Sequence, residues 1–331
     1  MMTAESSQAR QSALAAESHR LASKLRDYLV LTPLSVFAAM SEELNAEVLV
    51  KSEHQQCTGS FKPRGALAKA LSLSLSQRQR GVVTASSGNH GLAVAYALAA
   101  LGGRATVFVP SCASPSKVTA IRRLGAEIRA TGTDVGILEG LARAYAADHD
   151  LTYVSPYNDV DVIAGQGTLA VEMAEQAAGG GLDTVFVSVG GGGLISGVAS
   201  VLKQCLPGVR VVGACPANDA AMAASVRAGR AVAIHALPTL SDGTAGSVED
   251  NAVTLELCRS LVDDWVLVTE DAIRDAMRMV IDTEHQLVEG AAAVAFAAAR
   301  DQRESLAGQR VGIVSCGGNI AASTLAIALS S

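Results

Sequence analysis

Short runs of β-branched and other apolar residues alternate with alanine-rich segments from about residue 80 to the end of the chain. The intervening segments, such as GLAVAYALAALG, place apolar residues at helical spacing. The runs are continuously apolar, so we expect parallel strands that are buried on both faces. The pattern predicts an α/β fold. The runs cover residues 81–87, 105–110, 126–132, 152–156, 184–190, 210–216, 265–270 and 310–316.

The composition fits a globular protein of roughly two domains, with 331 residues, 49% of them apolar and 18% charged. The formal net charge is −6, and the chain has no lysine or arginine run. This argues against nucleic acid or an anionic membrane as the main partner and favours a small-molecule substrate.

The cysteines and the N-terminal segment indicate in which cellular compartment the protein is expected. Six scattered cysteines show no zinc-like spacing, so we expect reduced thiols. The polar N-terminal segment lacks the apolar core of a signal peptide, and no apolar run is long enough for a membrane span. We therefore expect a cytoplasmic protein without a membrane partner.

A glycine run, Gly190, Gly191, Gly192 and Gly193, follows one predicted strand and precedes Leu194 and a helix. Backbone amides in such a loop and at a helix start can surround a phosphate. A dinucleotide-binding fold would need an acidic residue at the end of the next strand, where Cys215 stands. A glycine-rich turn without a ligand is the remaining alternative.

A second loop, SSGNHG, spans Ser86 to Gly91 at another strand end. Its hydroxyls, amide, imidazole and helix-start N–H groups can hold a carboxylate. Simple helix capping by Ser87 or Asn89 is the alternative.

Two further motifs are rich in glycine. The last strand ends in SCGGN (residues 315–319), where a planar group could approach closely, or which forms a tight turn with an inert buried cysteine. The tract IAGQGT (163–168) has more glycine than a helix start normally accepts, so we expect it to pack closely against a neighbouring loop.

The stretch TGSFKPRGA places Lys62 between a phenylalanine and a proline. By itself Lys62 would be a surface charge before a helix that Pro63 starts. Lysine is scarce in this chain, however, and arginine cannot replace a primary amine in carbonyl chemistry. A phosphate loop, a carboxylate loop, a slot for a ring and one specially placed lysine together describe pyridoxal 5′-phosphate chemistry.

The sequence resembles the fold-type II pyridoxal-phosphate enzymes, in the branch of threonine/serine dehydratases and serine racemases. The matching motifs SFKPRGA, SSGNHG, IAGQGT, GGGGL and CGGN occur in the family's order over residues 58–319. The resemblance implies two open, twisted, mostly parallel sheets with helices on both faces, as in the tryptophan synthase β-like fold. It implies a large cofactor-binding domain of residues 1–74 and 161–331, a small domain of residues 75–160 with the asparagine loop, and a homodimer.

The resemblance also assigns roles to residues. Lys62 would be the Schiff-base residue and would remove the α-proton, and Ser87 would serve the second face of the α-carbon in a racemase. The cofactor would be bound by Phe61, Lys62, Asn89, Gly190, Gly191, Gly192, Gly193, Leu194, Glu289 and Cys316. The substrate would be bound by Ser86, Ser87, Gly88, Asn89, His90, Tyr157 and Asp242.

These roles predict a dehydratase that converts a β-hydroxy amino acid, such as L-threonine or L-serine, to a 2-oxo acid and ammonia through aminoacrylate. The alternatives are a racemase of serine or 3-hydroxyaspartate, and a dehydratase of a hydroxylated amino acid in hydroxyectoine breakdown. The segment SDGTAGSVEDNAVT suggests the last, and Asp242 would read a polar substituent or form only a turn. Glu289 would lie near the ring or be a satisfied carboxylate at a helix start. Cys215 stands where cation-activated relatives have a glutamate, so we expect a buried cysteine and no metal site.

Overall fold

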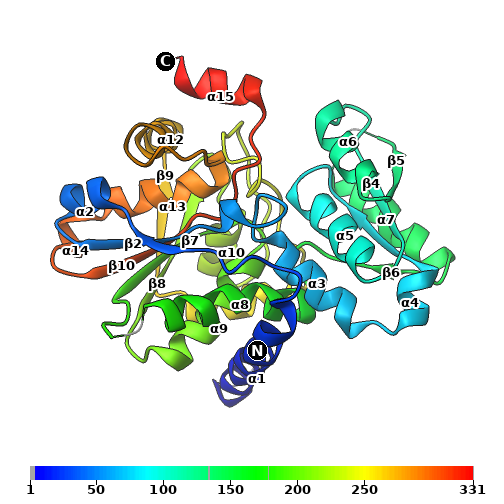
Figure 1. The fold of residues 1–331 in the computed structure, drawn as a ribbon, viewed down its shortest axis with the longest axis horizontal. Coiled ribbons are helices and arrows are strands. Elements are labelled where there is room, and N and C mark those ends of the chain that lie inside the picture. Colours follow the sequence, from blue (N-terminus) through cyan, green and yellow to red (C-terminus); the bar gives the residue numbers. More distant parts are fainter. Residues whose placement is uncertain (1–3, 133–134, 178, 331) are drawn as a thin grey trace.

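The computed structural model describes residues 4–132, 135–177 and 179–330, and its strands form two sheets (Figure 1). The strands are β1 (Leu34–Val36), β2 (Glu47–Lys51), β3 (Val82–Ala85), β4 (Ala105–Val109), β5 (Glu127–Ala130), β6 (Thr152–Tyr153), β7 (Thr184–Ser188), β8 (Arg210–Pro216), β9 (Asp264–Val268) and β10 (Arg310–Val314). The helices are α1 (Ala4–Leu25), α2 (Ala38–Leu44), η1 (Glu53–Gln55, 3-10), α3 (Lys62–Ser72), α4 (Leu75–Arg80), α5 (Asn89–Ala100), α6 (Pro115–Arg123), α7 (Val135–Asp148), α8 (Val160–Gln176), α9 (Gly193–Cys205), α10 (Ala221–Ala228), α11 (Val253–Leu261), α12 (Glu270–Glu284), α13 (Gly290–Asp301), α14 (Arg303–Leu306) and α15 (Ala322–Leu329).

The larger sheet has the strand order β1-β2-β10-β7-β8-β9. Its neighbouring strands run parallel apart from β1, which pairs with β2 in the antiparallel sense. Figure 1 shows α12 and α13 on one side of this sheet and α8 and α9 on the other. The predicted fold class, with mostly parallel sheets and helices on both faces, is confirmed.

The smaller sheet has the order β5-β4-β3-β6, and its strands are parallel. Successive residues of a strand face opposite sides, and here both sides are apolar. Val83 and Phe108 pack in a core with Leu138 of α7, whereas Val82 and Val107 belong to the main core, which α5 also enters. This two-sided burial explains why the central strands β3 and β4 read as continuous apolar runs.

Each of the eight predicted apolar runs coincides with a strand, β3 to β10. The sequence pattern missed β1 and β2. β1 is half-exposed along its length, and β2 begins with an exposed glutamate and ends with Lys51, which is fully buried. A strand that buries a charged residue does not read as an apolar run.

The chain passes between the two sheets twice, after α3 and before α8. These two crossings are tied together, because Lys69 Nζ lies 2.7 Å from Asp159 Oδ2 and 3.0 Å from Asp161 Oδ2. Ser72 also donates a hydrogen bond to Asp161. The contacts hold the end of α3 against the start of α8.

The IAGQGT tract lies inside α8, so the prediction that it packs against a loop is wrong. Its neighbours are helices. A Cβ atom on Gly165 would lie 2.5 Å from the Arg64 carbonyl oxygen and 2.6 Å from Ala68 Cβ, both in α3. Gly167 approaches the backbone of Gly197 in α9 in the same way. Glycine is needed here because the helix backbones are in contact, and this contact overrides its low helix propensity.

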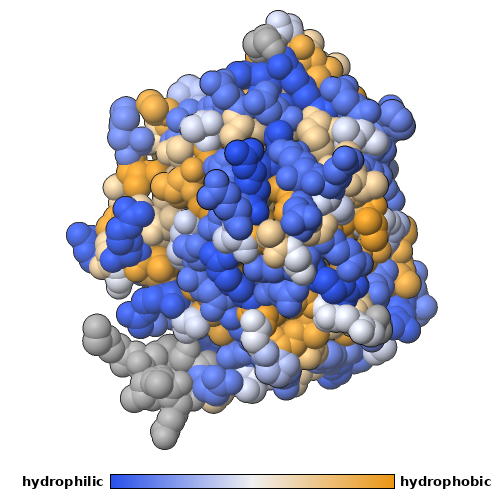
Figure 2. All heavy atoms as spheres, turned by 90° about the vertical axis from the view of Figure 1, so that its left-hand side faces the viewer, coloured by the Kyte–Doolittle hydropathy of each residue, from blue (hydrophilic) through white to orange (hydrophobic). Residues whose placement is uncertain are grey.

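The face at the left of Figure 1, beyond α2 and α14, mixes hydrophilic and apolar residues throughout (Figure 2). Among the described residues, no helix combines the length and the apolar character that crossing a membrane requires.

Candidate active site

A cavity of about 500 Å³ lies where loops from both sheets meet, a volume typical of small-molecule sites. The loops after β3, β7 and β10 contribute to it, together with the start of α3. Parallel strands bring their carboxyl ends to one edge of a sheet, which is why motifs far apart in sequence converge here. All the predicted site residues line this cavity: Phe61, Lys62, Ser86, Ser87, Gly88, Asn89, His90, Tyr157, Gly190, Gly191, Gly192, Gly193, Leu194, Asp242, Glu289 and Cys316.

Lys62 is the first residue of α3, and Pro63 follows in the first turn of the helix, as predicted. The preceding backbone is anchored to the loop after β10, because Phe61 N–H donates to Cys316 O at 3.0 Å. Lys62 Nζ lies 3.3 Å from the Pro156 carbonyl oxygen, within the cavity lining. Burial lowers the pKa of Lys62 to about 8, against a weaker opposing effect of Cys316 and Glu289. The neutral amine, which is the nucleophilic form, is therefore accessible near neutral pH.

The glycine loop is shaped by close contacts. A Cβ atom on Gly190 would lie 2.6 Å from Thr244 O, and one on Gly193 would lie 2.9 Å from Tyr157 Cα. Gly192 has φ 84°, a left-handed conformation, and is the N-cap of α9. The loop therefore places the first N–H groups of α9, which have no intrahelical partner, at the cavity wall.

The SSGNHG loop leads into α5 through Gly88, which is the N-cap and makes no side-chain cap hydrogen bond. Capping by Ser87 or Asn89, the alternative explanation of this motif, is therefore wrong. Ser86 Oγ instead accepts a hydrogen bond from Gly88 N at 3.1 Å. The N–H groups of the first turn of α5 stay available for an anion.

His90 is buried, with Nε2 3.1 Å from the Val154 carbonyl oxygen. Nε2 therefore carries the hydrogen, and Nδ1 is an acceptor with no partner among the described residues. Burial, together with the nearby Lys62, lowers the pKa of His90 to about 3. We had expected the imidazole to help hold a carboxylate, but in this arrangement the donor that His90 offers is its backbone N–H.

Asn89 and Glu289 meet on the cavity wall. The Asn89 amide donates to both oxygens of Glu289 at 2.9 and 3.1 Å, and Asn319 N–H donates to the same carboxylate at 3.0 Å. Glu289 is the N-cap residue of α13 and its carboxylate is satisfied by these donors, so it is both a residue of the cavity wall and the satisfied helix-start carboxylate of the alternative prediction. Burial raises the pKa of Glu289.

Cys316 and Cys215 are both buried, as predicted for Cys215. Cys316 lines the cavity, and burial raises the pKa of its thiol well above the usual value, so it is a neutral neighbour for a bound ring. Cys215 is fully buried, and its thiol lies 3.5 Å from Val189 O. Within the described ranges, no group of three or more His, Cys, Asp or Glu side chains is arranged to hold a metal ion.

The sequence reasoning overlooked Ser188, at the end of β7. Its side chain is buried and lines the cavity, and Oγ has no hydrogen-bond partner in the described part of the chain. Its position at the strand end, two residues before Gly190, was the available signal. A buried, unpartnered hydroxyl beside free helix N–H groups fits a polar ligand in this cavity.

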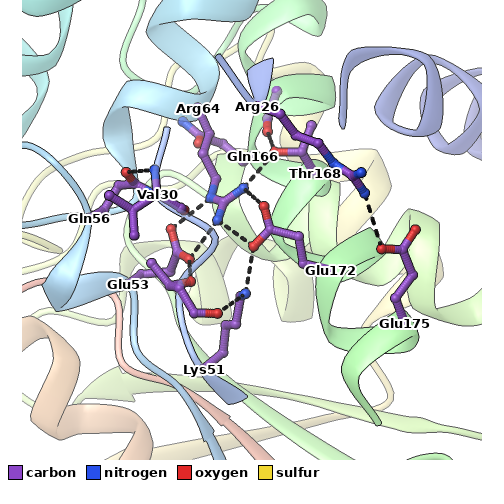
Figure 3. A network of polar contacts seen from close by, with 12 residues as sticks. Arg26, Val30, Lys51, Glu53, Gln56, Arg64, Gln166, Thr168, Glu172 and Glu175 are labelled. Carbon is purple, nitrogen blue, oxygen red and sulfur yellow. Dashed lines mark hydrogen bonds and ion pairs between the residues drawn. The ribbon is translucent and has the colours of Figure 1, made fainter. Parts of the chain in front are cut away.

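A buried network of charges behind Lys62 was also missed (Figure 3). Arg64 is fully buried and contacts Glu53 of η1 at 2.7 Å and Glu172 of α8 at 2.7 Å. Lys51 Nζ lies 2.6 Å from the same Glu172. Although burial acts to raise it, the Arg64 guanidinium holds the pKa of Glu53 below its ordinary value. The network joins α3, η1 and α8 just behind the reactive amine.

The network also reaches the loop after β10. His54, the residue after Glu53, lies 2.7 Å from Ser315 Oγ through Nδ1 and 2.7 Å from Gln286 Oε1 through Nε2. Ser315 directly precedes Cys316. The positions of Lys62 and Cys316 are therefore set by one connected set of contacts.

These residues fit pyridoxal 5′-phosphate. The cavity offers an amine, free helix N–H groups and the unpartnered Ser188 hydroxyl for an anion, and a neutral thiol beside the space for a ring. The family model described as "Pyridoxal-phosphate dependent enzyme" matches residues 25–317. The chain belongs to this family, and its cofactor is pyridoxal 5′-phosphate.

Within this family, the chain is similar to an ammonia-lyase, a deaminase and a racemase. The chain is 40% identical to the L-threonine ammonia-lyase of Thermotoga maritima over 89% of its own length and 73% of that protein. It superimposes with a TM-score of 0.92 on the processed form of threonine deaminase isoform 2 from Solanum lycopersicum, at 31% identity, covering 97% of this chain and 87% of that one. Maize serine racemase gives a TM-score of 0.88 at 31% identity, with 96% of both chains covered.

Proposed function

We propose that the chain is a lyase that dehydrates a β-hydroxy amino acid. The substrate loses its α-proton and its β-hydroxyl, and hydrolysis of the resulting enamine gives a 2-oxo acid and ammonia. The observation that carries this proposal is the position of Lys62, whose amine shares one cavity with two helix N-termini, those of α5 and α9. The ammonia-lyase and deaminase names of the relatives support it.

The helix that follows the glycine loop would hold the cofactor phosphate through Gly190, Gly191, Gly192, Gly193 and Leu194, and we add Ser188 to this set. Cys316 would face the pyridine nitrogen, Asn89 the ring hydroxyl, and Phe61 and Glu289 would border the ring. When bound, the cofactor supplies a carbonyl that takes up an amine and a ring that withdraws electrons from the α-carbon. The neutral thiol of Cys316 would leave that ring mostly unprotonated.

On the substrate side, Ser86, Ser87, Gly88, Asn89 and His90 would hold the carboxylate, mainly through backbone N–H groups. Lys62 would take the α-proton as a neutral amine, a form that its lowered pKa of about 8 makes available. Tyr157 and Asp242 would border the side chain.

Racemisation is the second candidate, supported by the structural similarity to maize serine racemase. Ser87 lies on the cavity wall, and its hydroxyl would return a proton to the opposite face of the α-carbon. The β-hydroxyl would then be retained, so the two activities differ in their products.

We also propose that residues 75–160 form a small domain and residues 1–74 and 161–331 a large one. This division is supported by the strands that each sheet contains. A homodimer and a cytoplasmic location are proposed from the resemblance and from the lack of a signal-peptide pattern.

Two measurements test the function. Cofactor-loaded protein should show an absorption band at longer wavelength than the protein's own, and Lys62→Ala should abolish it, whereas the exposed Lys24→Ala should keep it. Formation of 2-oxo acid and of the opposite enantiomer should then be followed with L-serine, L-threonine, both 3-hydroxyaspartate diastereomers, phenylserine and 3-hydroxy-2,4-diaminobutyrate. Accumulation of enantiomer without any 2-oxo acid would replace the lyase proposal with the racemase.

A further inference from the structure

Four charged side chains line the part of the cavity beyond the amine and the carboxylate loop: Lys117, Glu139, Asp242 and Glu249. A substrate whose carboxylate lies at the start of α5 and whose amine lies at Lys62 has to extend its side chain into this part of the cavity. The charges there therefore decide which side chains are accepted.

Two of the carboxylates already have partners. Lys117 Nζ lies 3.3 Å from Asp242 Oδ2. Glu249 Oε1 lies 2.9 Å from Arg143 Nη2, and its Oε2 accepts a hydrogen bond from Asn158 Nδ2 at 2.9 Å. Each of these carboxylates is compensated by one cation.

Glu139 has no such compensation. It projects from α7 into the cavity lining and is only partly exposed. Among the described residues, its carboxylate forms no hydrogen bond and no ion pair within 4 Å. Three carboxylates against the two cations Lys117 and Arg143 leave one negative charge on this wall. Burial and the neighbouring Glu249 raise the pKa of Glu139 against a weaker opposing effect of Arg143, so a further cation placed close to this carboxylate would favour its charged form.

The cavity also contains buried polar atoms that lack partners, Ser188 Oγ and His90 Nδ1. Ser188 lies near the glycine loop and His90 in the SSGNHG loop, so these atoms, which lack partners among the described residues, indicate independently of the carboxylates that the cavity as a whole receives a polar ligand. The uncompensated charge of Glu139 then gives the sign of the group that the ligand brings to this wall.

We propose that Glu139 selects substrates whose side chain carries a second, positively charged amine, so that the physiological substrate is a β-hydroxy diamino acid. This inference rests on the proposed dehydratase function and names its substrate class. A cationic substituent would form an ion pair with Glu139 in a partly desolvated setting, where such pairs are stronger than at the surface. A side-chain carboxylate, as in 3-hydroxyaspartate, would add a fourth negative charge to the same wall.

Binding is measured with amino acids that lack the β-hydroxyl, so that recognition is separated from chemistry. Calorimetric titration of the holoenzyme compares 2,4-diaminobutyrate, 2-aminobutyrate and aspartate. We expect 2,4-diaminobutyrate to bind roughly 10-fold or more tighter than 2-aminobutyrate, the size expected for one added charge interaction, and aspartate to bind weakest. Glu139→Gln should remove the advantage of 2,4-diaminobutyrate and leave 2-aminobutyrate binding within about 2-fold.

Glu127→Gln is the matched control. Glu127 lies in β5 of the smaller sheet, against which α7 packs; it is exposed, pairs with Arg129 at 2.8 Å and is not part of the cavity lining. It should leave all three affinities unchanged. The cofactor absorption and the urea midpoint of Glu139→Gln should match those of wild type, since the side chain is partly exposed and makes no hydrogen bond to lose.

The outcomes separate the two proposals. If the holoenzyme prefers aspartate, or if Glu139→Gln weakens 2,4-diaminobutyrate and 2-aminobutyrate equally, the assignment of Glu139 is wrong even when dehydration is observed. If 2,4-diaminobutyrate is preferred through Glu139 but no 3-hydroxy amino acid yields a 2-oxo acid, the specificity assignment stands and the dehydratase proposal fails.

Discussion

Arg64 and Glu53 form a two-point ion pair with no solvent exposure, in which Arg64 Nε and Nη2 lie 2.7 and 2.8 Å from the two carboxylate oxygens. Arg64 is two residues beyond Lys62 in α3, so its pairing with Glu53 of η1 fixes the start of that helix. Taking charges out of water is costly, so each partner depends on the other remaining in place.

Removing the Arg64 side chain should therefore destabilise the folded protein strongly. Arg64→Met leaves Glu53 buried without its cation, and we expect the free energy of unfolding to fall by about 3–5 kcal/mol. Urea denaturation measures this. Arg26→Met is the control, because Arg26 and Glu175 are exposed and 3.5 Å apart, and its loss should stay below about 1 kcal/mol. Equal losses in both variants would contradict a special role of the buried pair.

The contact between α3 and α8 makes Gly165→Ala a second test. The added Cβ would lie 2.5 Å from a backbone oxygen of α3, and overpacking of this kind costs about 1–3 kcal/mol. Gly140→Ala, at an exposed position of α7 where a Cβ meets nothing within 4 Å, should instead stabilise by up to about 1 kcal/mol. Thermal unfolding of both variants should show shifts of opposite sign.

The pKa of Lys62 predicts a dependence of stability on pH in the protein without cofactor. The folded-state pKa is about 8 and the ordinary value is 10.5, so between these pH values the unfolded chain binds more protons. Stability should therefore rise with pH across this window. Lys62→Met lacks this contribution, so its stability advantage over wild type should be largest below pH 8 and shrink toward pH 10.5. Urea midpoints at pH 7 and pH 10 test the sign, and an advantage that grows with pH would contradict it.

Glu289→Gln tests the hydrogen bonds by which the Glu289 carboxylate links Asn89 and Asn319 on the cavity wall. The carboxylate accepts from three N–H groups, whereas glutamine replaces one acceptor with a donor that faces them. We expect a loss of about 1–3 kcal/mol, the usual cost of leaving a buried donor without an acceptor. Glu256→Gln, which removes only an exposed pair with Arg259, should change the urea midpoint very little.

Much of this site could be predicted from the sequence, for a physical reason. Asn89 and Gly190 follow the ends of β3 and β7 by a few residues, and parallel strands bring their carboxyl ends together without any knowledge of side-chain packing. The order of motifs along the chain was therefore enough to anticipate which residues share one cavity.

The remaining features depend on packing that no local pattern encodes. Arg64 and Glu172 are separated by 108 positions, and an arginine in a helix usually indicates a solvated face. The orientation of His90 depends on the carbonyl of Val154, 64 positions away. Glu139 resembles any exposed helical glutamate until α7 is seen to line the cavity. Pairing across the fold, and not residue type, gives these three residues their properties.

The contacts at the two crossings between the sheets have a mechanical consequence. Lys69 joins the last turn of α3 to Asp159 and Asp161 at the start of α8, so the two connections between the sheets are held to each other at one place. Lys117 and Asp242 come from opposite walls of the cavity. Any rearrangement that widened the cavity between these two residues would have to break the Lys117–Asp242 pair, whereas the Lys69 contacts lie within the crossings themselves.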